Sequence, residues 1–169
     1  NKIKNFNNFI KAYSNSKFLK KNYEIVFFGN TRFTNEENIL FNKLQILDKV
    51  KFISGNDYVL SNCYSQAKLF IYPSLYEGFG LPLLEAMGHK CPVVCSNTSS
   101  MPEVAEDAAY YFNPYSIENI QSSIEKVLKN DELKDHLIKK GLSQCKKFTW
   151  HKNATETLSL YKRLINENA

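Results

Sequence analysis

Residues 69–96, LFIYPSLYEGFGLPLLEAMGHKCPVVCS, form the stretch that decides the fold. An apolar run over 68–73 leads through a loop into an apolar segment that starts near Leu81, and a second apolar run covers 91–96. Runs of this length are typical of buried strands, and Pro82 fits the first turn of a helix between them. The stretch therefore predicts a strand, a helix and a second strand in succession.

The same alternation covers the first two thirds of the chain. Further strand-like runs lie at 23–29, 50–54 and 108–112, helical patterns at 5–20, 34–47 and 57–67, and three final helices at 116–129, 131–147 and 150–166. Parallel neighbours in a sheet have to be joined by crossover helices, so the alternation predicts a parallel sheet. We expect an α/β fold: a doubly wound, Rossmann-like parallel sheet with helices on both faces and a helical C-terminus.

The composition is that of one soluble globular domain. The 169 residues are 43% hydrophobic and 23% charged, and no apolar run reaches the length that spans a bilayer. The formal charge of +5 comes almost entirely from lysine, with Arg32 and Arg163 as the only arginines, so no nucleic-acid partner is expected. A cytoplasmic location is the default. The lysines of 126–152 leave open peripheral association with the inner face of a membrane, against the simpler alternative of a solvated helix face.

Metal and cofactor chemistry is not expected. The four cysteines show no metal-type pairing, and Cys91 and Cys95 are too far apart along one strand to form a disulfide, so all four are expected to be reduced. The three histidines share no ligand spacing, and no Asp-x-Asp pair is present to hold a divalent ion on a diphosphate.

The loop after the 68–73 strand carries the strongest functional signal. Gly78 and Gly80 permit unusual backbone angles and close approach of a ligand, and a helix start with free amides attracts anions. Glu77 lies in this loop, and Glu85 lies one turn into the helix. Glu85 has apolar neighbours in the sequence, so we expect it to be buried and to need a partner such as the hydroxyls of a polyol. The structural alternative is a first-turn acid that complements the helix dipole.

Three other segments give weaker signals. Gly55 to Tyr58 follow the 50–54 strand and suit either a flat base or an ordinary turn. Lys4, at the start of the first helix, suits either a phosphate contact or a surface lysine. Ser100 and Glu103 predict a capping box, beside amides of 98–100 that are open to a ligand.

Residues 69–114 resemble the donor-binding half of family 4 retaining glycosyltransferases, which have the two-domain GT-B fold. Glu77 and Glu85, within EGFGLPLLE, match the E-x7-E motif of that family. KNFNNFIKAY near the N-terminus and FTWHKNATETLSLY near the C-terminus are similar to the helices that begin and end this half. The resemblance covers essentially the whole chain and implies the C-terminal half of a GT-B fold.

The resemblance implies a role for each matched residue. Glu77 would be the catalytic residue and would hydrogen-bond the hydroxyls of the transferred sugar. The backbone of Gly78, Phe79, Gly80 and Leu81 would contact sugar and diphosphate, Glu85 would hold the ribose, and Lys4 the diphosphate. No metal or cofactor is implied. The donor would be a GDP- or UDP-sugar, with GDP-mannose preferred, and the acceptor a glycan or a lipid-linked glycan of polysaccharide biosynthesis.

Two parts of the family pattern have no match in residues 1–169: the acceptor-binding N-terminal domain and the first strand of the donor domain. We therefore expect a single nucleotide-sugar-binding domain that is a fragment, with a gap in the sheet beside 68–73 and no transfer activity in isolation. We predict that the complete protein is an enzyme, a hexosyltransferase. Its alternative is a non-catalytic nucleotide-sugar-binding or scaffold subunit of the same fold.

Overall fold

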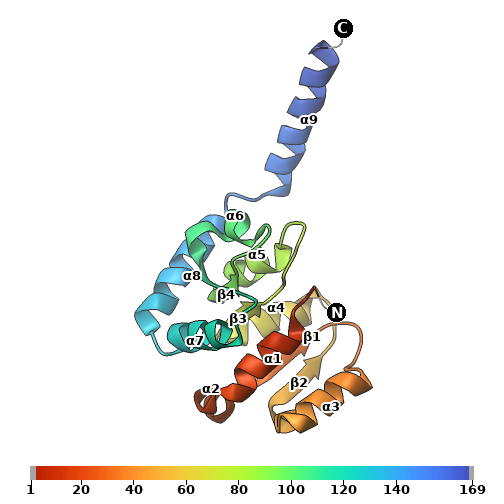
Figure 1. Ribbon diagram of the computed structural model, residues 1–169. Helices are drawn as coiled ribbons and strands as arrows, with labels where there is room; N and C mark the ends of the chain where they lie inside the picture. The colour runs from red at the N-terminus through yellow and green to blue at the C-terminus, as the bar shows by residue number, and fades with distance from the viewer. Residues whose placement is uncertain (1–2, 168–169) are drawn as a thin grey trace.

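The computed structural model describes residues 3–167, in which parallel strands alternate with helices (Figure 1). One sheet pairs β1 (Ile25–Phe28) with β2 (Val50–Ile53). The other has the order β3 (Phe70–Tyr72), β4 (Val93–Ser96) and β5 (Ala109–Phe112). All pairings are parallel, which confirms the predicted fold class. The strands form two sheets, and β3 lies at the edge of its sheet.

The helices follow the predicted order, with two changes of extent. They are α1 (Phe6–Asn15), α2 (Lys17–Asn22), α3 (Asn35–Lys43), α4 (Asp57–Gln66), α5 (Leu81–Gly88), α6 (Met101–Ala105), α7 (Ile117–Leu128), α8 (Asp131–Cys145) and α9 (Trp150–Glu167). The helix expected over 5–20 is broken at Ser16, which has an extended backbone and accepts the Leu19 amide to cap α2. The helix expected over 34–47 ends at Lys43, and a short 3-10 turn follows at Leu47–Lys49.

The helix caps test the local sequence signals. Thr34 and Glu37 form a complete capping box at the start of α3. Thr149 accepts the Lys152 amide at the start of α9, as predicted. The box predicted for Ser100 and Glu103 is wrong, because the Ser100 hydroxyl turns away from α6 and donates to the backbone of the loop between β3 and α5.

Helices cover both faces of the β3–β4–β5 sheet. Val94 of β4 faces a core that includes Ile10 of α1 and Ile124 of α7. Val93 and Cys95 face the opposite core, which contains buried residues of α4, α5 and α6. Successive side chains of a strand point to opposite faces, so one apolar strand serves two cores. This explains why the 91–96 run is apolar throughout.

Close packing of α5 against α8 fixes the position of α5. A Cβ added at Gly141 of α8 would lie 2.9 Å from Cγ of Met87 in α5, a separation that real side chains do not adopt. Met87 is itself completely buried. Gly141 therefore allows α8 to approach α5 closely. This packing holds α5, and the loop that precedes α5, against the body of the domain.

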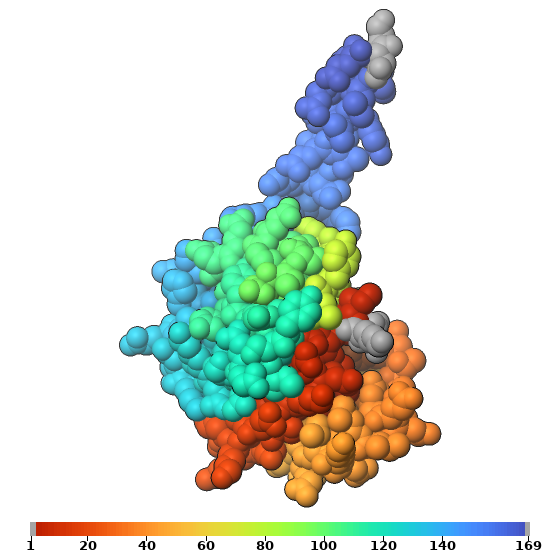
Figure 2. Space-filling view, in the orientation of Figure 1, coloured from red at the N-terminus to blue at the C-terminus, as the bar shows by residue number. Residues whose placement is uncertain are grey.

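The last helix, α9, stands clear of the body (Figures 1 and 2). It has no buried residue, and its apolar side chains are open to solvent, with Trp150 84% exposed. The stripe that the sequence predicts is exposed along its length and consists of Trp150, Ala154, Leu158, Tyr161 and Ile165. The predicted helix is confirmed, and its apolar face is not packed against the body in this structure.

The cysteines are all free thiols, as expected. Burial raises the pKa of the Cys91 thiol to about 12, so the thiol stays protonated near neutral pH. Within residues 3–167, none of the helices combines the length and apolar character needed to cross a membrane.

Candidate active site

The site is built on the loop between β3 and α5. Gly80, at the N-cap of α5, has φ of +106°, a backbone conformation that favours glycine. Pro82 follows in the first turn, as predicted. Gly78 does not share the unusual φ, but it is exposed, with open space where a Cβ would be. Gly80 therefore starts the helix, and Gly78 leaves the loop backbone accessible.

Hydroxyl groups from the loop after β4 hold this loop in place. Ser99 Oγ donates to the Glu77 carbonyl at 2.7 Å and accepts from the Glu77 amide at 3.2 Å. Ser100 Oγ lies 3.0 Å from the Glu77 carbonyl and 2.8 Å from the Phe79 carbonyl. The sequence offered amides of 98–100 as ligand contacts and missed this clamp. The consecutive hydroxyl residues after the neighbouring strand were the available signal.

Glu77 and Lys4 form an ion pair at 2.6 Å between Nζ and Oε1. The Glu77 side chain is 15% exposed and that of Lys4 51% exposed, so the pair lies at the edge of the protein surface. Burial raises the pKa of Glu77, but the hydrogen bond from Lys4 and the nearby Ser74 and Tyr72 hydroxyls outweigh it, and the pKa is lowered. Glu77 is therefore a carboxylate at neutral pH. The resemblance placed both residues near one ligand, and they contact each other.

Glu85 is exposed on α5, so the expectation that it is buried is wrong. Neighbours in the sequence of a helix point in different directions, so Leu83, Ala86 and Met87 face the core while Glu85 faces outward. Its carboxylate has one side-chain partner, the Tyr64 hydroxyl, which donates to Oε2 at 3.1 Å. The sequence did not single out Tyr64, because residues 64 and 85 meet only through the tertiary fold.

Tyr72, the last residue of β3, connects the two acids. Burial raises the pKa of the Tyr72 hydroxyl, and so do a hydrogen bond to Glu77 and the charges of Glu77 and Glu85. Both carboxylates therefore lie within electrostatic reach of one side chain. Phe79 and Leu81 expose their side chains on the loop between them. The structure thus brings together Lys4, Glu77 and the 78–81 backbone, with Glu85 one helical turn further on.

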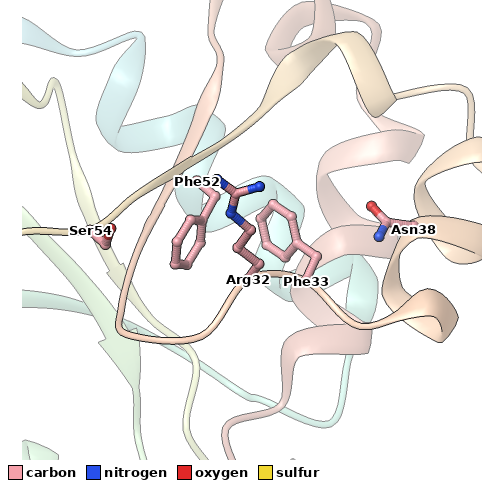
Figure 3. Close-up of a pocket in the computed structure, with 5 residues that line it drawn as sticks. All are labelled: Arg32, Phe33, Asn38, Phe52 and Ser54. Atoms are coloured by element: carbon pink, nitrogen blue, oxygen red, sulfur yellow. The ribbon is translucent and has the colours of Figure 1, made fainter.

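A hollow of about 450 Å³ lies where β1 and β2 end at their carboxyl edge. Arg32, Phe33 and Phe52 line it, and Asn38 and Ser54 complete the lining (Figure 3). The two rings are in edge contact, with centroids 5.6 Å apart. The sequence did not predict this hollow, since Arg32 stood out only as a rare arginine.

The Gly55–Tyr58 segment beside this hollow behaves as a turn. Asn56 accepts the Val59 amide and caps α4, and a Cβ at Gly55 would lie 2.8 Å from Val59. Of the two alternatives left open by the sequence, the turn therefore explains these residues. Tyr58 is exposed.

Within the described residues, no group of three or more His, Cys, Asp or Glu side chains is placed to hold a metal ion. The charged groups of the site are Lys4, Glu77 and Glu85, with the amide end of α5. These groups suit hydrogen bonding to hydroxyls and charge compensation of an anion.

Comparison with known families identifies the fold. A family model described as glycosyl transferases group 1 matches residues 1–144. The chain belongs to this family. The crystal structure of the C-terminal domain of the group 1 family protein LpcC from Francisella tularensis superimposes with a TM-score of 0.74 and 25% identity, over 87% of this chain and 80% of that chain. The expected C-terminal half of a GT-B fold is confirmed.

Two further proteins match this chain over part of their own length. Sucrose-phosphate synthase of Thermosynechococcus elongatus matches in fold with a TM-score of 0.85 and 21% identity, over 99% of this chain and 44% of that chain. O-antigen chain mannosyltransferase B of Escherichia coli is 44% identical over 108 residues, which are 64% of this chain and 28% of that protein. The matched part of the chain thus spans less than a third of the length of this mannosyltransferase.

Proposed function

We propose that this chain is the donor-binding part of a retaining hexosyltransferase of polysaccharide biosynthesis. The donor is a nucleotide-sugar, with GDP-mannose preferred over UDP-sugars, and the acceptor is a glycan or a lipid-linked glycan. The observation that carries the proposal is the Lys4–Glu77 pair at the glycine-started helix α5, in a member of the glycosyl transferases group 1 family. The mannosyltransferase name of the Escherichia coli relative supports the choice of sugar.

In this proposal Lys4 and Glu77 separate to receive the donor. The Lys4 ammonium compensates the diphosphate, and Glu77 accepts hydrogen bonds from sugar hydroxyls, a role that its low pKa favours. Negative charge grows on the departing diphosphate, so Lys4 and the amide end of α5 stabilise the transition state more than the ground state. The exposed Gly78, Phe79 and Leu81, together with the buried Gly80, line the path between these groups.

The rest of the nucleotide extends along the carboxyl edge of the strands. We assign the ribose to Glu85 and the base to the hollow of Arg32, Phe33 and Phe52. Ligands of open α/β sheets bind beyond the carboxyl ends of the strands, and this hollow is at that edge. The Arg32 guanidinium offers only donors, which suit the carbonyl oxygens of guanine or uracil.

We also propose that transfer requires an acceptor-binding domain and one more strand, neither of which residues 1–169 contain. In support, β1 pairs only with β2, and β3 only with β4, so each has one strand edge without a strand partner in the described residues. The greater length of the Escherichia coli relative is a second support. Robust sugar transfer by residues 1–169 alone would refute this part of the proposal.

Membrane association is a weaker proposal. Most lysines of the 126–152 stretch form ion pairs with acids of the same domain, which leaves less positive charge for an anionic surface. The pairs are Lys129–Glu125, Lys134–Asp131, Lys140–Asp107, Lys147–Glu106 and Lys152–Glu156. These pairs favour the alternative of a solvated helix face.

Calorimetry tests the donor assignment directly. We expect the purified protein to bind GDP and GDP-mannose more tightly than UDP and UDP-glucose. Lys4→Met should weaken GDP binding about tenfold, because a charge-assisted contact to phosphate is lost. Absence of binding by all four compounds would overturn the proposed function. Binding without turnover in the full-length protein would favour the non-catalytic scaffold.

A further inference from the structure

The Glu85 carboxylate is exposed but tethered, a combination that needs explanation. A glutamate on a helix surface normally samples several rotamers, and holding one of them costs conformational entropy. Here Oε2 accepts a hydrogen bond from Tyr64, a side chain that is only 7% exposed. A mobile surface acid is thereby bonded to a rigid buried ring.

Tyr64 is itself held from two sides. Its ring is in edge contact with Phe70, with centroids 5.3 Å apart, and it stacks on the His89 ring at 5.8 Å. Tyr64 belongs to α4, whereas Glu85 belongs to α5 and His89 directly follows it. The tether therefore joins two helices that lie on the same face of the sheet.

A second hydrogen-bonded link between the same helices fixes the His89 ring. His89 Nδ1 lies 2.8 Å from the Glu85 carbonyl, and Nε2 lies 2.7 Å from Ser61 Oγ. A carbonyl can only accept, so Nδ1 carries the proton, and Nε2 accepts from the Ser61 hydroxyl. Ser61 and Tyr64 are three residues apart in α4 and share one helix face. The His89 ring on which Tyr64 stacks is thus held in one orientation.

We infer that Tyr64 is a positioning residue for the donor nucleotide: it holds Glu85 Oε2 so that Oε1 faces the vicinal hydroxyls of a ribose. Glu85 Oε1 makes no hydrogen bond to another described residue. A carboxylate with one oxygen already occupied is oriented before the ligand arrives, so less rotamer entropy is lost on binding. The inference rests on the proposed function and extends it, since it names the residue that sets the geometry at the ribose.

The Tyr64 hydroxyl is suited to this role because it stays a donor. Burial raises its pKa, and the Glu85 charge and the hydrogen bond to Glu85 raise it further. The hydroxyl is therefore neutral near neutral pH, where it donates its hydrogen bond to the carboxylate. A purely structural tyrosine in this core would not need a carboxylate partner.

The test uses Tyr64→Phe, which removes only the hydroxyl. Calorimetry measures the dissociation constants of GDP and UDP and of their 2′,3′-dideoxy counterparts. We expect Tyr64→Phe to weaken binding of the ribose nucleotides about five- to tenfold and to leave the dideoxy compounds within twofold of wild type. In a Glu85→Gln background, Tyr64→Phe should have little further effect, since the two residues act through one contact.

Tyr13→Phe is the matched control, because Tyr13 is a buried tyrosine whose hydroxyl donates to the Tyr23 carbonyl away from the site. It should bind all compounds as wild type does. Equal losses for ribose and dideoxy nucleotides in Tyr64→Phe, or no loss at all, would overturn the role of Tyr64 and leave the proposed function intact. Failure of wild type to bind any nucleotide would overturn the proposed function and this inference together.

Discussion

Glu77 and Glu85 belong to one motif, yet their surroundings differ in kind. Glu77 is half-buried on a loop, paired with the charge of Lys4, and its backbone is held by Ser99 and Ser100. Glu85 is exposed on a regular helix and bonded to the neutral hydroxyl of Tyr64. The Glu77 carboxylate is held by the opposite charge of Lys4, whereas the Glu85 carboxylate is held by a single hydrogen bond from a neutral hydroxyl. This difference predicts unequal effects when each is changed.

The largest effect is expected for Glu77→Gln. The neutral amide keeps the shape but loses the charge that pairs with Lys4 and accepts sugar hydroxyls. Transfer by the complete enzyme should fall by about 10²-fold or more in kcat. Glu85→Gln should act mainly on the donor KM, by less than about tenfold. Steady-state kinetics with donor varied checks both, and wild-type kcat in Glu77→Gln would contradict the catalytic assignment.

The next effect concerns the two glycines between these acids. Gly80→Ala places a side chain at φ of +106° and a Cβ 3.2 Å from Leu83, so we expect a loss of about 1–2 kcal/mol in the free energy of unfolding. Gly78→Ala is the matched control, since open space surrounds that position, and its effect should be near zero. Urea denaturation measures both changes. Equal stability of the two variants would show that the loop does not need the Gly80 conformation.

The smallest effect is a pH dependence. The pKa of Glu77 is lowered from 4.5 in the folded state, because the hydrogen bond from Lys4 and the nearby Ser74 and Tyr72 hydroxyls outweigh burial. A lowered pKa means that the pair stabilises the fold above about pH 4.5 and loses this contribution as the pH falls through the folded value. Lys4→Met should therefore flatten the acid side of the stability curve. Thermal unfolding from pH 7 to pH 3 in both proteins checks this, and parallel curves would contradict it.

Local chemistry in the sequence predicted much of the fold. Each of the five apolar runs contains a strand, Pro82 lies in the first turn of α5, and Thr34 with Glu37 caps α3. These features depend on residues close together in the chain, so spacing is enough to reveal them. The break of the first helix at Ser16 was missed, because Ser16 also donates to Glu125 of a distant helix.

The candidate site was harder to predict, because its contacts join distant segments. Glu77 and Glu85 stood out by sequence, but the burial of Glu85 was wrong, since apolar neighbours in the chain lie on the other face of a helix. The Ser99 and Ser100 clamp and the Tyr64 tether could not be read from spacing. Each of these contacts spans more than twenty residues and exists only once the sheet is assembled.

A crystal structure of the protein with GDP-mannose would test the central claim most directly. We expect the Lys4–Glu77 pair to be opened by the ligand, with sugar hydroxyls within hydrogen-bond distance of Glu77 and the diphosphate at Lys4 and the start of α5. The ribose should contact Glu85, and the base should lie in the hollow beside Arg32. A donor bound elsewhere, with the Lys4–Glu77 pair intact, would contradict the account.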